Sequence, residues 1–236
     1  MGQERELKRL RGFLRRVRRG RPERGGDGAY VERRRRLGVF QCTRLKTTHG
    51  DLLADTRYRP AVEFFFDELY VTRDITGRDL DLERMAPLMV RTLPRRMLDT
   101  LCLALEMEAL SQDLDARLLG HLDPAAAGTL DRRGWLEAYR RCDDYGDRRR
   151  QVDLIGLIGG RLDKVVRRRG LGMALRMARH PAHLSGFGEI HDLLERGYRA
   201  FRHMRGAETF LKRIVDREHR IIEQIRGGNP DPLEVQ

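Results

Sequence analysis

The sequence predicts an all-α fold, a multi-helix bundle of about eight to ten helices that follows a basic, partly flexible N-terminal tail. Apolar residues recur at spacings of three and four along most of the 236 residues, as they do on the buried side of helices. No segment alternates apolar and polar residues for long, and no Asn-Gly or Asp-Gly pair joins two apolar runs. These observations predict helices and argue against strands.

Five periodic segments form the first half of the chain. Residues 3–19 predict an amphipathic helix with a basic side, and residues 30–53 predict a long second helix. Pro60 suits the first position of a third helix, and Asp79 can cap a fourth. The segment 94–119 is apolar on most sides, so we expect it in the centre of the bundle. The second of these helices also carries a polar stripe, made of Gln41, Arg44, Thr48 and Asp51.

Five further periodic segments form the second half. They are residues 135–145, 151–168, 171–179, 185–201 and 207–226. Gly156 and Gly160 lie opposite the apolar stripe of their helix, where they would let another backbone approach closely. The helix that begins at residue 171 should end at His180, because the residue before a proline disfavours the helical backbone.

The positive charge is concentrated at the N-terminus. The chain carries 48 Lys and Arg residues against 36 Asp and Glu residues, a formal net charge of +12. Residues 1–36 contain 14 basic and five acidic residues, which accounts for 14 − 5 = +9 of that total. We expect a basic tail over residues 1–28, a single helical domain over 29–228 and a C-terminal tail over 229–236.

The charge of residues 1–36 suits a weak anionic partner, either nucleic acid or a membrane surface. The competing interpretation is a solvated tail, or a helix that docks on its own domain. Because residues 1–28 have little apolar face beyond one short helix, and Gly25, Gly26 and Gly28 separate them from the body, we expect their deletion to remove few core contacts and to leave the fold intact.

The cysteines and the missing motifs limit the classes of protein. Cys42, Cys102 and Cys142 are odd in number, far apart and without the spacing of a zinc site, which favours a reducing compartment. The basic start lacks the apolar stretch of a signal peptide. We therefore expect a cytoplasmic protein without a transmembrane segment. The P-loop, HExxH, GxSxG and EF-hand motifs are also missing, so no cofactor is indicated.

A short aromatic motif carries a family resemblance. Phe64-Phe65-Phe66-Asp67-Glu68-Leu69-Tyr70 resembles the motif of a bacterial family named for FFLEELY, with Phe in place of Leu and Asp in place of Glu at its third and fourth positions. The similarity extends to Leu110-Ser111. That family has no established activity, so the resemblance implies a bacterial, cytoplasmic protein and supplies no catalytic residue.

The same motif makes two predictions about packing. Phe65 and Leu69 lie in the middle of the apolar face of their helix, so we expect both in the core. Phe64 points to another side of the helix. It either contacts a neighbouring helix, which is the favoured interpretation, or anchors a partner.

Four polar residues fall on the apolar faces of predicted helices: Glu108, Glu218, His49 and His191. A buried carboxylate is costly unless it is paired, so these groups need partners. If they converge, they form a metal or acid–base site inside the bundle, comparable to the glutamates and histidines of helical di-iron proteins. If they are dispersed, each glutamate pairs with an arginine and each histidine bonds to a backbone carbonyl, which is the favoured interpretation.

His180, His183 and His191 are also close in sequence, around a predicted helix start. His180 and His183 make a poor pair of metal ligands unless a third residue folds back. A solvated loop is therefore favoured over a metal site here.

Two classes of function follow from these patterns. The favoured one is a non-enzymatic interaction or binding module built on a helical bundle. The alternative is a metal- or cofactor-dependent protein that uses the buried glutamate and histidine groups.

Overall fold

The fold is described by a computed structural model over residues 2–20, 28–69, 76–122 and 130–233. Every regular element in these ranges is an α-helix, which confirms the predicted all-α class. The helices are α1 (Gly2–Arg19), α2 (Gly28–Thr48), α3 (Gly50–Ala54), α4 (Arg59–Leu69), α5 (Thr76–Thr92), α6 (Arg95–His121), α7 (Arg132–Cys142), α8 (Tyr145–Val166), α9 (Leu171–Leu184), α10 (Gly188–Met204) and α11 (Glu208–Arg226).

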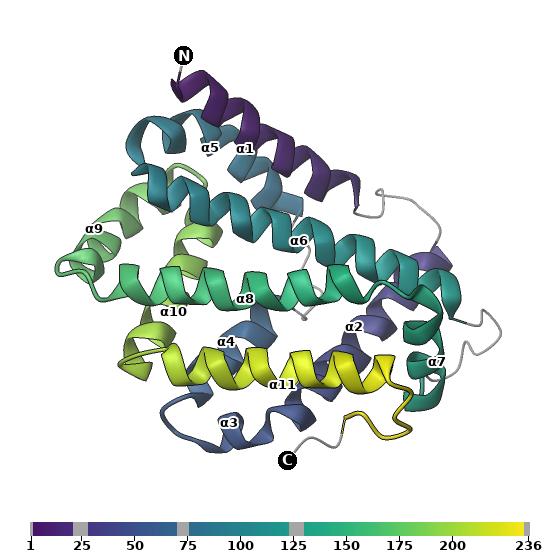
Figure 1. Cartoon of the computed structure of the whole chain (residues 1–236). Coiled ribbons are helices and arrows are strands. Elements are labelled where there is room, and N and C mark those ends of the chain that lie inside the picture. Colours follow the sequence, from purple (N-terminus) through teal and green to yellow (C-terminus); the bar gives the residue numbers. More distant parts are fainter. Residues whose placement is uncertain (1, 21–27, 70–75, 123–129, 234–236) are drawn as a thin grey trace.

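The long helices are stacked in layers around α8 (Figure 1). Helix α8 lies between α6 on one side and α11 on the other, and it contacts both along its length. Helices α1 and α5 cover the far side of α6, while α10 runs across the layers and contacts α4, α8 and α9. Among the described residues, no helix has the length and apolar content that a membrane-spanning segment requires.

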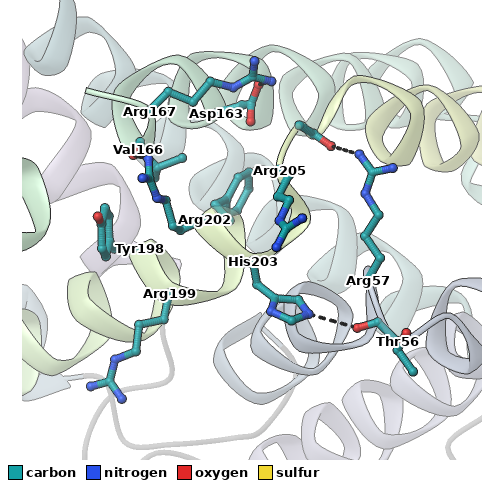
Figure 2. Close-up of a pocket in the computed structure, with 12 residues that line it drawn as sticks. Thr56, Arg57, Asp163, Val166, Arg167, Tyr198, Arg199, Arg202, His203 and Arg205 are labelled. Atoms are coloured by element: carbon teal, nitrogen blue, oxygen red, sulfur yellow. Dashed lines mark hydrogen bonds and ion pairs between the residues drawn. The ribbon is translucent and has the colours of Figure 1, made fainter. Parts of the chain in front are cut away.

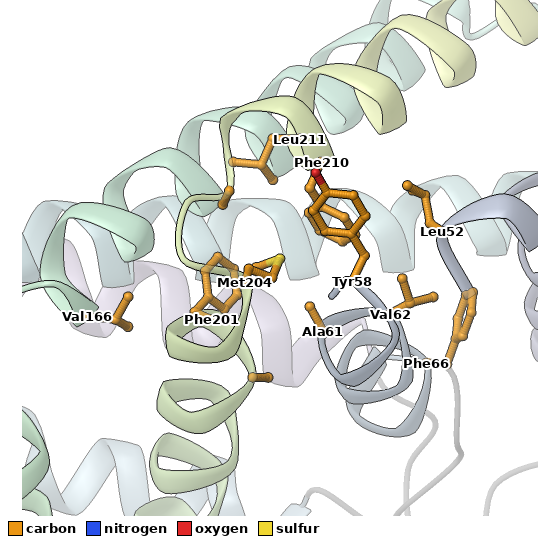
Figure 3. Packing of buried hydrophobic residues seen from close by; sticks show 12 residues of the cluster. Leu52, Tyr58, Ala61, Val62, Phe66, Val166, Phe201, Met204, Phe210 and Leu211 are labelled. Carbon is orange, nitrogen blue, oxygen red and sulfur yellow. The ribbon is translucent and has the colours of Figure 1, made fainter. Parts of the chain in front are cut away.

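The aromatic motif contributes to a core cluster formed by α3, α4, α10 and α11 (Figure 3). Phe66 is buried there, whereas Phe65 is only partly buried and lies with its ring 5.9 Å from that of Phe201 and 6.4 Å from that of Phe210. Phe64 also packs against the cluster. The side chains of residues 67–69 and all of Tyr70 lie outside the described residues, so the prediction for Leu69 stays open.

Helix α1 packs on the body of the molecule through its apolar side. Leu10, Leu14 and Val17 are each at most 2% exposed, and they share a buried cluster with residues of α5 and α6. The expectation that this segment makes few core contacts is therefore corrected. The reason is that three apolar residues, spaced four and three apart, form a narrow apolar stripe, and this stripe is wide enough to pack against α5 and α6.

Two predicted helix boundaries shift, and both shifts position a histidine. The helix expected over residues 30–53 breaks at His49, which becomes the residue that precedes α3. The helix expected to end at His180 continues through Pro181 to Leu184. A proline removes one backbone donor without forbidding the helix, and Ser185 N donates to Pro181 O at 3.1 Å to complete the last turn.

Helices α8 and α11 approach closely at one glycine. A Cβ added to Gly159 would lie 2.4 Å from Cδ2 of Leu211, so any side chain there would have to displace Leu211. Gly156 faces Val215 in the same interface, but the atom near it, 3.0 Å from an added Cβ, is the side-chain Cγ2 and not the predicted backbone. Gly160, the other predicted contact, has open space around it instead, because it lies one residue past the face that meets α11.

Candidate functional site

Two of the four predicted site residues meet in the interior. Nε2 of His49 lies 2.9 Å from Oε1 of Glu218, and the histidine is 4% exposed while the glutamate is 8% exposed. Arg44 donates from Nη1 to both carboxylate oxygens of Glu218, at 2.8 Å and 2.6 Å. The carboxylate is therefore paired with a guanidinium and an imidazole at once, which is what a buried charge requires.

A second arginine continues this network on the other side of the imidazole. Arg217 Nη1 lies 3.3 Å from His49 Nδ1 and donates to Oδ1 of Asp51 at 2.7 Å. Because a guanidinium only donates, His49 Nδ1 is the acceptor and Nε2 carries the hydrogen that is donated to Glu218. The network therefore uses both ring nitrogens of His49 and both oxygens of Glu218.

The charge of Glu218 is stabilised by this arrangement. Burial by itself raises the pKa of a carboxyl group. The charge of Arg44 and the hydrogen bonds from His49 and Arg44 outweigh that effect, and they lower the pKa of Glu218 to about 2. The residue stays ionised across the physiological pH range, so it acts here as a fixed anion between α2 and α11.

The predicted polar stripe makes interior contacts at Gln41 and Arg44 of α2, whereas its last member, Asp51 of α3, is 47% exposed. Gln41 donates to Oδ1 of Asp115 on α6 at 3.0 Å, and the Arg44 guanidinium lies 6.0 Å from the centre of the Trp135 ring on α7. Burial raises the pKa of Asp115, against the lowering effect of the Gln41 hydrogen bond. The sequence reasoning identified the stripe but not Asp115, whose position on α6 gives no sign of its partner.

The other two predicted site residues lie elsewhere. Glu108 on α6 accepts a hydrogen bond from Gln112 Nε2 at 2.8 Å. His191 lies in the first turn of α10, where its Nε2 is 2.8 Å from the carbonyl oxygen of Leu175. The structure therefore brings His49 and Glu218 together, with an arginine on each side, and places Glu108 and His191 in separate environments.

A pocket of about 860 Å³ opens where α8 and α10 end and α11 begins (Figure 2). Val166, Tyr198 and Phe201 supply its apolar wall. Asp163 is the only acidic side chain among the described residues that line it. The basic side chains that line it are Arg57, Arg167, Arg199, Arg202, Arg205 and His203.

Some of these arginines also satisfy the ends of helices. Arg57 Nε donates at 2.7 Å to the carbonyl oxygen of Met204, the last residue of α10. Arg202 Nη1 lies 3.5 Å from the carbonyl oxygen of Val166, the last residue of α8. Cations are favoured at these carbonyl ends because the helix dipole is negative there. This explains why basic residues collect at the meeting point of two helix ends.

The arrangement leaves positive charge available in the pocket. Arg167 donates to Oδ2 of Asp163 at 2.5 Å, and Oδ1 of the same carboxylate accepts from Ala207 N at 3.2 Å, so the one acid is already engaged. The Arg205 backbone N–H donates to Arg202 O at 3.3 Å, but its guanidinium makes no hydrogen bond or ion pair with the residues that the structure describes. In Figure 2 the guanidinium of Arg205 lies between the side chains of His203 and Arg57. This pocket was not predicted from the sequence. Its signal in the sequence is a row of arginines at spacings of three near the end of one helix, Arg199, Arg202 and Arg205.

Comparison with known proteins places the chain in a family. No curated protein and no solved structure matches it. A family model described as a domain of unknown function, DUF8198, matches residues 21–232. The match begins after α1 and covers α2 to α11, including the buried network and the arginine-lined pocket. Because the match spans most of the 236 residues, the chain belongs to the DUF8198 family.

Proposed function

We propose that this protein is a helical binding module that takes an anionic, phosphate-bearing small molecule in the arginine-lined pocket. The observation that carries the proposal is the excess of positive charge: five guanidinium groups and one imidazole line the pocket with one carboxylate, and among the described residues only Arg199 has a further acid, Glu195, at 2.9 Å. The volume of about 860 Å³ lies within the roughly 300–1,000 Å³ typical of small-molecule sites.

The chemistry of the lining favours phosphate over other anions. A guanidinium presents five N–H donors in a planar fork, which matches the oxygens of a phosphate group in a bidentate manner. Arg57 and Arg202 use some of their donors on backbone carbonyls, and this fixes their position while further donors remain. The aromatic rings of Tyr198 and Phe201 offer an apolar surface to the rest of a ligand.

The buried network favours a structural role over a catalytic one. The carboxylate oxygens of Glu218 accept hydrogen bonds from Arg44 and His49. The other ring nitrogen of His49 faces Arg217. A metal ion or a substrate would have to replace one of these contacts. The alternative of a metal- or cofactor-dependent protein built on these buried groups therefore has less support than the binding module.

The proposal is tested by ligand-induced stabilisation. The full-length protein would be titrated with inorganic phosphate, pyrophosphate and ATP, with Tm and calorimetric heats as readouts. We expect Tm to rise with ligand concentration, since a ligand that binds the folded state stabilises it. Arg205→Gln should reduce the affinity at least tenfold, while Arg133→Gln, an 88% exposed side chain on the distant helix α7, should leave it unchanged. Equal affinities for the two variants, or no stabilisation by any of the three ligands, would overturn the proposal.

The finer expectations from the sequence belong to the same proposal. We regard the FFFDELY segment as a packing motif, because its first three residues contact the cluster between α4, α10 and α11. A cytoplasmic location agrees with Cys42, Cys102 and Cys142, which are free cysteines. A bacterial source rests on the resemblance of the FFFDELY segment.

A second candidate function concerns the outer side of α1. Its exposed basic residues Lys8, Arg11, Arg15 and Arg19 have no ion-pair partner in the described parts of the chain, whereas Arg9, Arg16 and Arg18 are paired with acids of α5 and α6. Because the apolar side of α1 is buried, insertion into a bilayer would require it to leave the body. This favours a purely electrostatic contact with a polyanion such as the nucleic-acid backbone.

A further inference from the structure

Three potential metal ligands meet where α9 turns into α10. Nε2 of His183 lies 3.1 Å from Oδ1 of Asp192, and Nδ1 of His191 lies 3.8 Å from the same oxygen. One ligand atom from each of the three residues lies within 4.8 Å of the others. His183 belongs to the last turn of α9, and the other two residues belong to the first turn of α10, so a single tight turn brings them together.

That turn is well defined by hydrogen bonds. Phe187 N donates to Ala182 O at 2.8 Å, and Gly186 adopts a φ of +80°, which favours glycine. Gly188 then lets the His183 ring lie against the start of α10, because a Cβ at that position would be 2.6 Å from His183 Nδ1. The extension of α9 past Pro181 is what delivers His183 to this place.

The ring of His191 is held in the orientation of a metal ligand. Its Nε2 lies 2.8 Å from the carbonyl oxygen of Leu175. A carbonyl only accepts, so Nε2 carries the hydrogen and Nδ1 keeps its lone pair. Histidines that bind metals commonly donate their other ring N–H to a backbone carbonyl, which fixes the tautomer.

The lone pair of His191 lacks a donor. The side chain is 5% exposed, and Nδ1 is buried without a hydrogen-bond partner among the residues that the structure describes. An unsatisfied buried acceptor costs stability, so something that accepts this lone pair is favoured there. The nearest carboxylate oxygen, Oδ1 of Asp192 at 3.8 Å, is beyond hydrogen-bond distance.

We propose that His183, His191 and Asp192 form a binding site for a divalent transition-metal ion, with Zn²⁺ as the best fit. Two imidazole nitrogens and one carboxylate oxygen match the ligand preferences of Zn²⁺, and a water molecule would complete a tetrahedron. The ion would take the place of the hydrogen between His183 Nε2 and Asp192, and that proton would be released to solvent or move to Nδ1 of His183. Bonds of about 2.0–2.1 Å place tetrahedral ligands roughly 3.3 Å apart, so a small closure of the three side chains suffices. His183 and Asp192 are 45% and 38% exposed, which leaves a path for the ion from solvent.

The site would act as a clamp between two helices. The carboxylate is available as a ligand, since the Asp192 side chain is 38% exposed and its Oδ1 lies 3.1 Å from Nε2 of His183. A metal ion bound by one residue of α9 and two of α10 would hold the helix pair together. Binding should therefore raise the stability of the folded chain.

The test uses the full-length protein without a histidine tag, stripped with a chelator and titrated with Zn²⁺ by calorimetry and by thermal unfolding. We expect one ion per chain, a higher Tm, and no comparable effect of Mg²⁺, which prefers oxygen ligands. His183→Ala and Asp192→Asn should weaken binding at least tenfold. His180→Ala, an exposed histidine of the same helix outside the cluster, should not.

A spectroscopic readout separates this site from adventitious binding. Co²⁺ at the proposed site should give visible d–d absorption in the wild type and in His180→Ala but not in His183→Ala. The chemical shifts of the His191 ring nitrogens should change when Zn²⁺ is added. Unchanged His191 shifts, equal Zn²⁺ affinity in His183→Ala, or a metal-free His191 with both nitrogens protonated at neutral pH would overturn the proposal.

Discussion

His49 and Glu218, which are 169 residues apart in sequence, lie 2.9 Å from each other between Nε2 and Oε1. The histidine marks the break between α2 and α3, and the glutamate lies in the middle of α11. Arg217, the neighbour of Glu218, donates at 2.8 Å to the carbonyl oxygen of Thr48, which is one of the backbone groups left without a helical partner by the break. One turn of α11 thus holds both the side chain and the backbone of the α2–α3 junction.

Removing the charge of Glu218 should destabilise the fold. Glu218→Gln leaves the Arg44 guanidinium buried without its counter-ion, and breaking a buried pair from one side typically costs about 3–5 kcal/mol. Chemical denaturation, followed by circular dichroism, measures the change. Glu223→Gln on the same helix is the matched control, since that side chain is 52% exposed and its pairing with Arg149 is at the surface. Similar stabilities for the two variants would show that the network contributes little.

The same residue predicts a pH dependence. The pKa of Glu218 is lowered from 4.5 to about 2 in the folded state. As the pH falls, the unfolded chain takes up this proton first, so the stabilisation is present above pH 4.5 and is lost between there and about pH 2. The free energy of unfolding, measured across this window, should fall less in Glu218→Gln than in the wild type. Parallel curves for both proteins would contradict the prediction.

The helices follow from the sequence because their signal is local. The spacing of Val62, Phe65 and Phe66, for example, is enough to identify α4 and its buried side. The break at His49 is different, since α2 could continue on its own propensity. His49 is held at this break by contacts with Glu218 and Arg217, and the residues next to His49 in the sequence do not indicate these distant partners.

The glycine contact between α8 and α11 gives a matched pair of variants. Gly159→Ala would place its Cβ 2.4 Å from Leu211, so we expect a loss of about 1–3 kcal/mol from overpacking. Gly160→Ala enters open space within the same helix and should stabilise the protein by about 0.5–1 kcal/mol. Thermal unfolding of both variants checks the sign. Stabilisation by both would mean that α8 and α11 do not approach closely at Gly159.

The buried side of α1 predicts a cost for truncating its apolar residues. Leu14→Ala removes a side chain that is 2% exposed, and such a change typically costs about 2–5 kcal/mol. Arg15→Ala, next to it on the exposed side, should change the free energy of unfolding by less than about 0.5 kcal/mol. Equal effects in a denaturant titration would show that α1 does not contribute to the core.

The outer side of α1 predicts salt-dependent retention on heparin. Replacing Lys8, Arg11, Arg15 and Arg19 with Gln removes four positive charges and should lower the salt concentration of elution, since counterion release sets the affinity. The control carries the same number of changes on exposed arginines elsewhere: Arg133, Arg141, Arg176 and Arg226. Elution of both variants at the same salt concentration would mean that retention depends on the net charge of the protein and not on the outer side of α1.

The candidate sites were only partly accessible from the sequence. Placing polar residues on apolar helix faces singled out His49 and Glu218, because a buried charge is conspicuous in a periodic pattern. It could not select Arg44 as the partner, since arginine is the commonest charged residue in this chain and Arg44 is 174 residues from Glu218. The pocket is still harder to predict from the sequence, because Arg57 and Arg205 come together only through the packing of α4 against α10.

The docking of α1 makes this helix an intramolecular ligand of its own protein. Its apolar stripe binds α5 and α6, and the ion pairs Arg9–Asp99, Arg16–Asp113 and Arg18–Glu83 join it to the same two helices at partly exposed positions. Tethering gives such a ligand a high effective concentration, so a weak intrinsic affinity is enough to keep it bound. High salt screens the ion pairs and leaves the apolar contact. The release of α1 would then be a local opening that exposes α5 and α6 well before the other helices unfold, and amide hydrogen exchange would detect it there first.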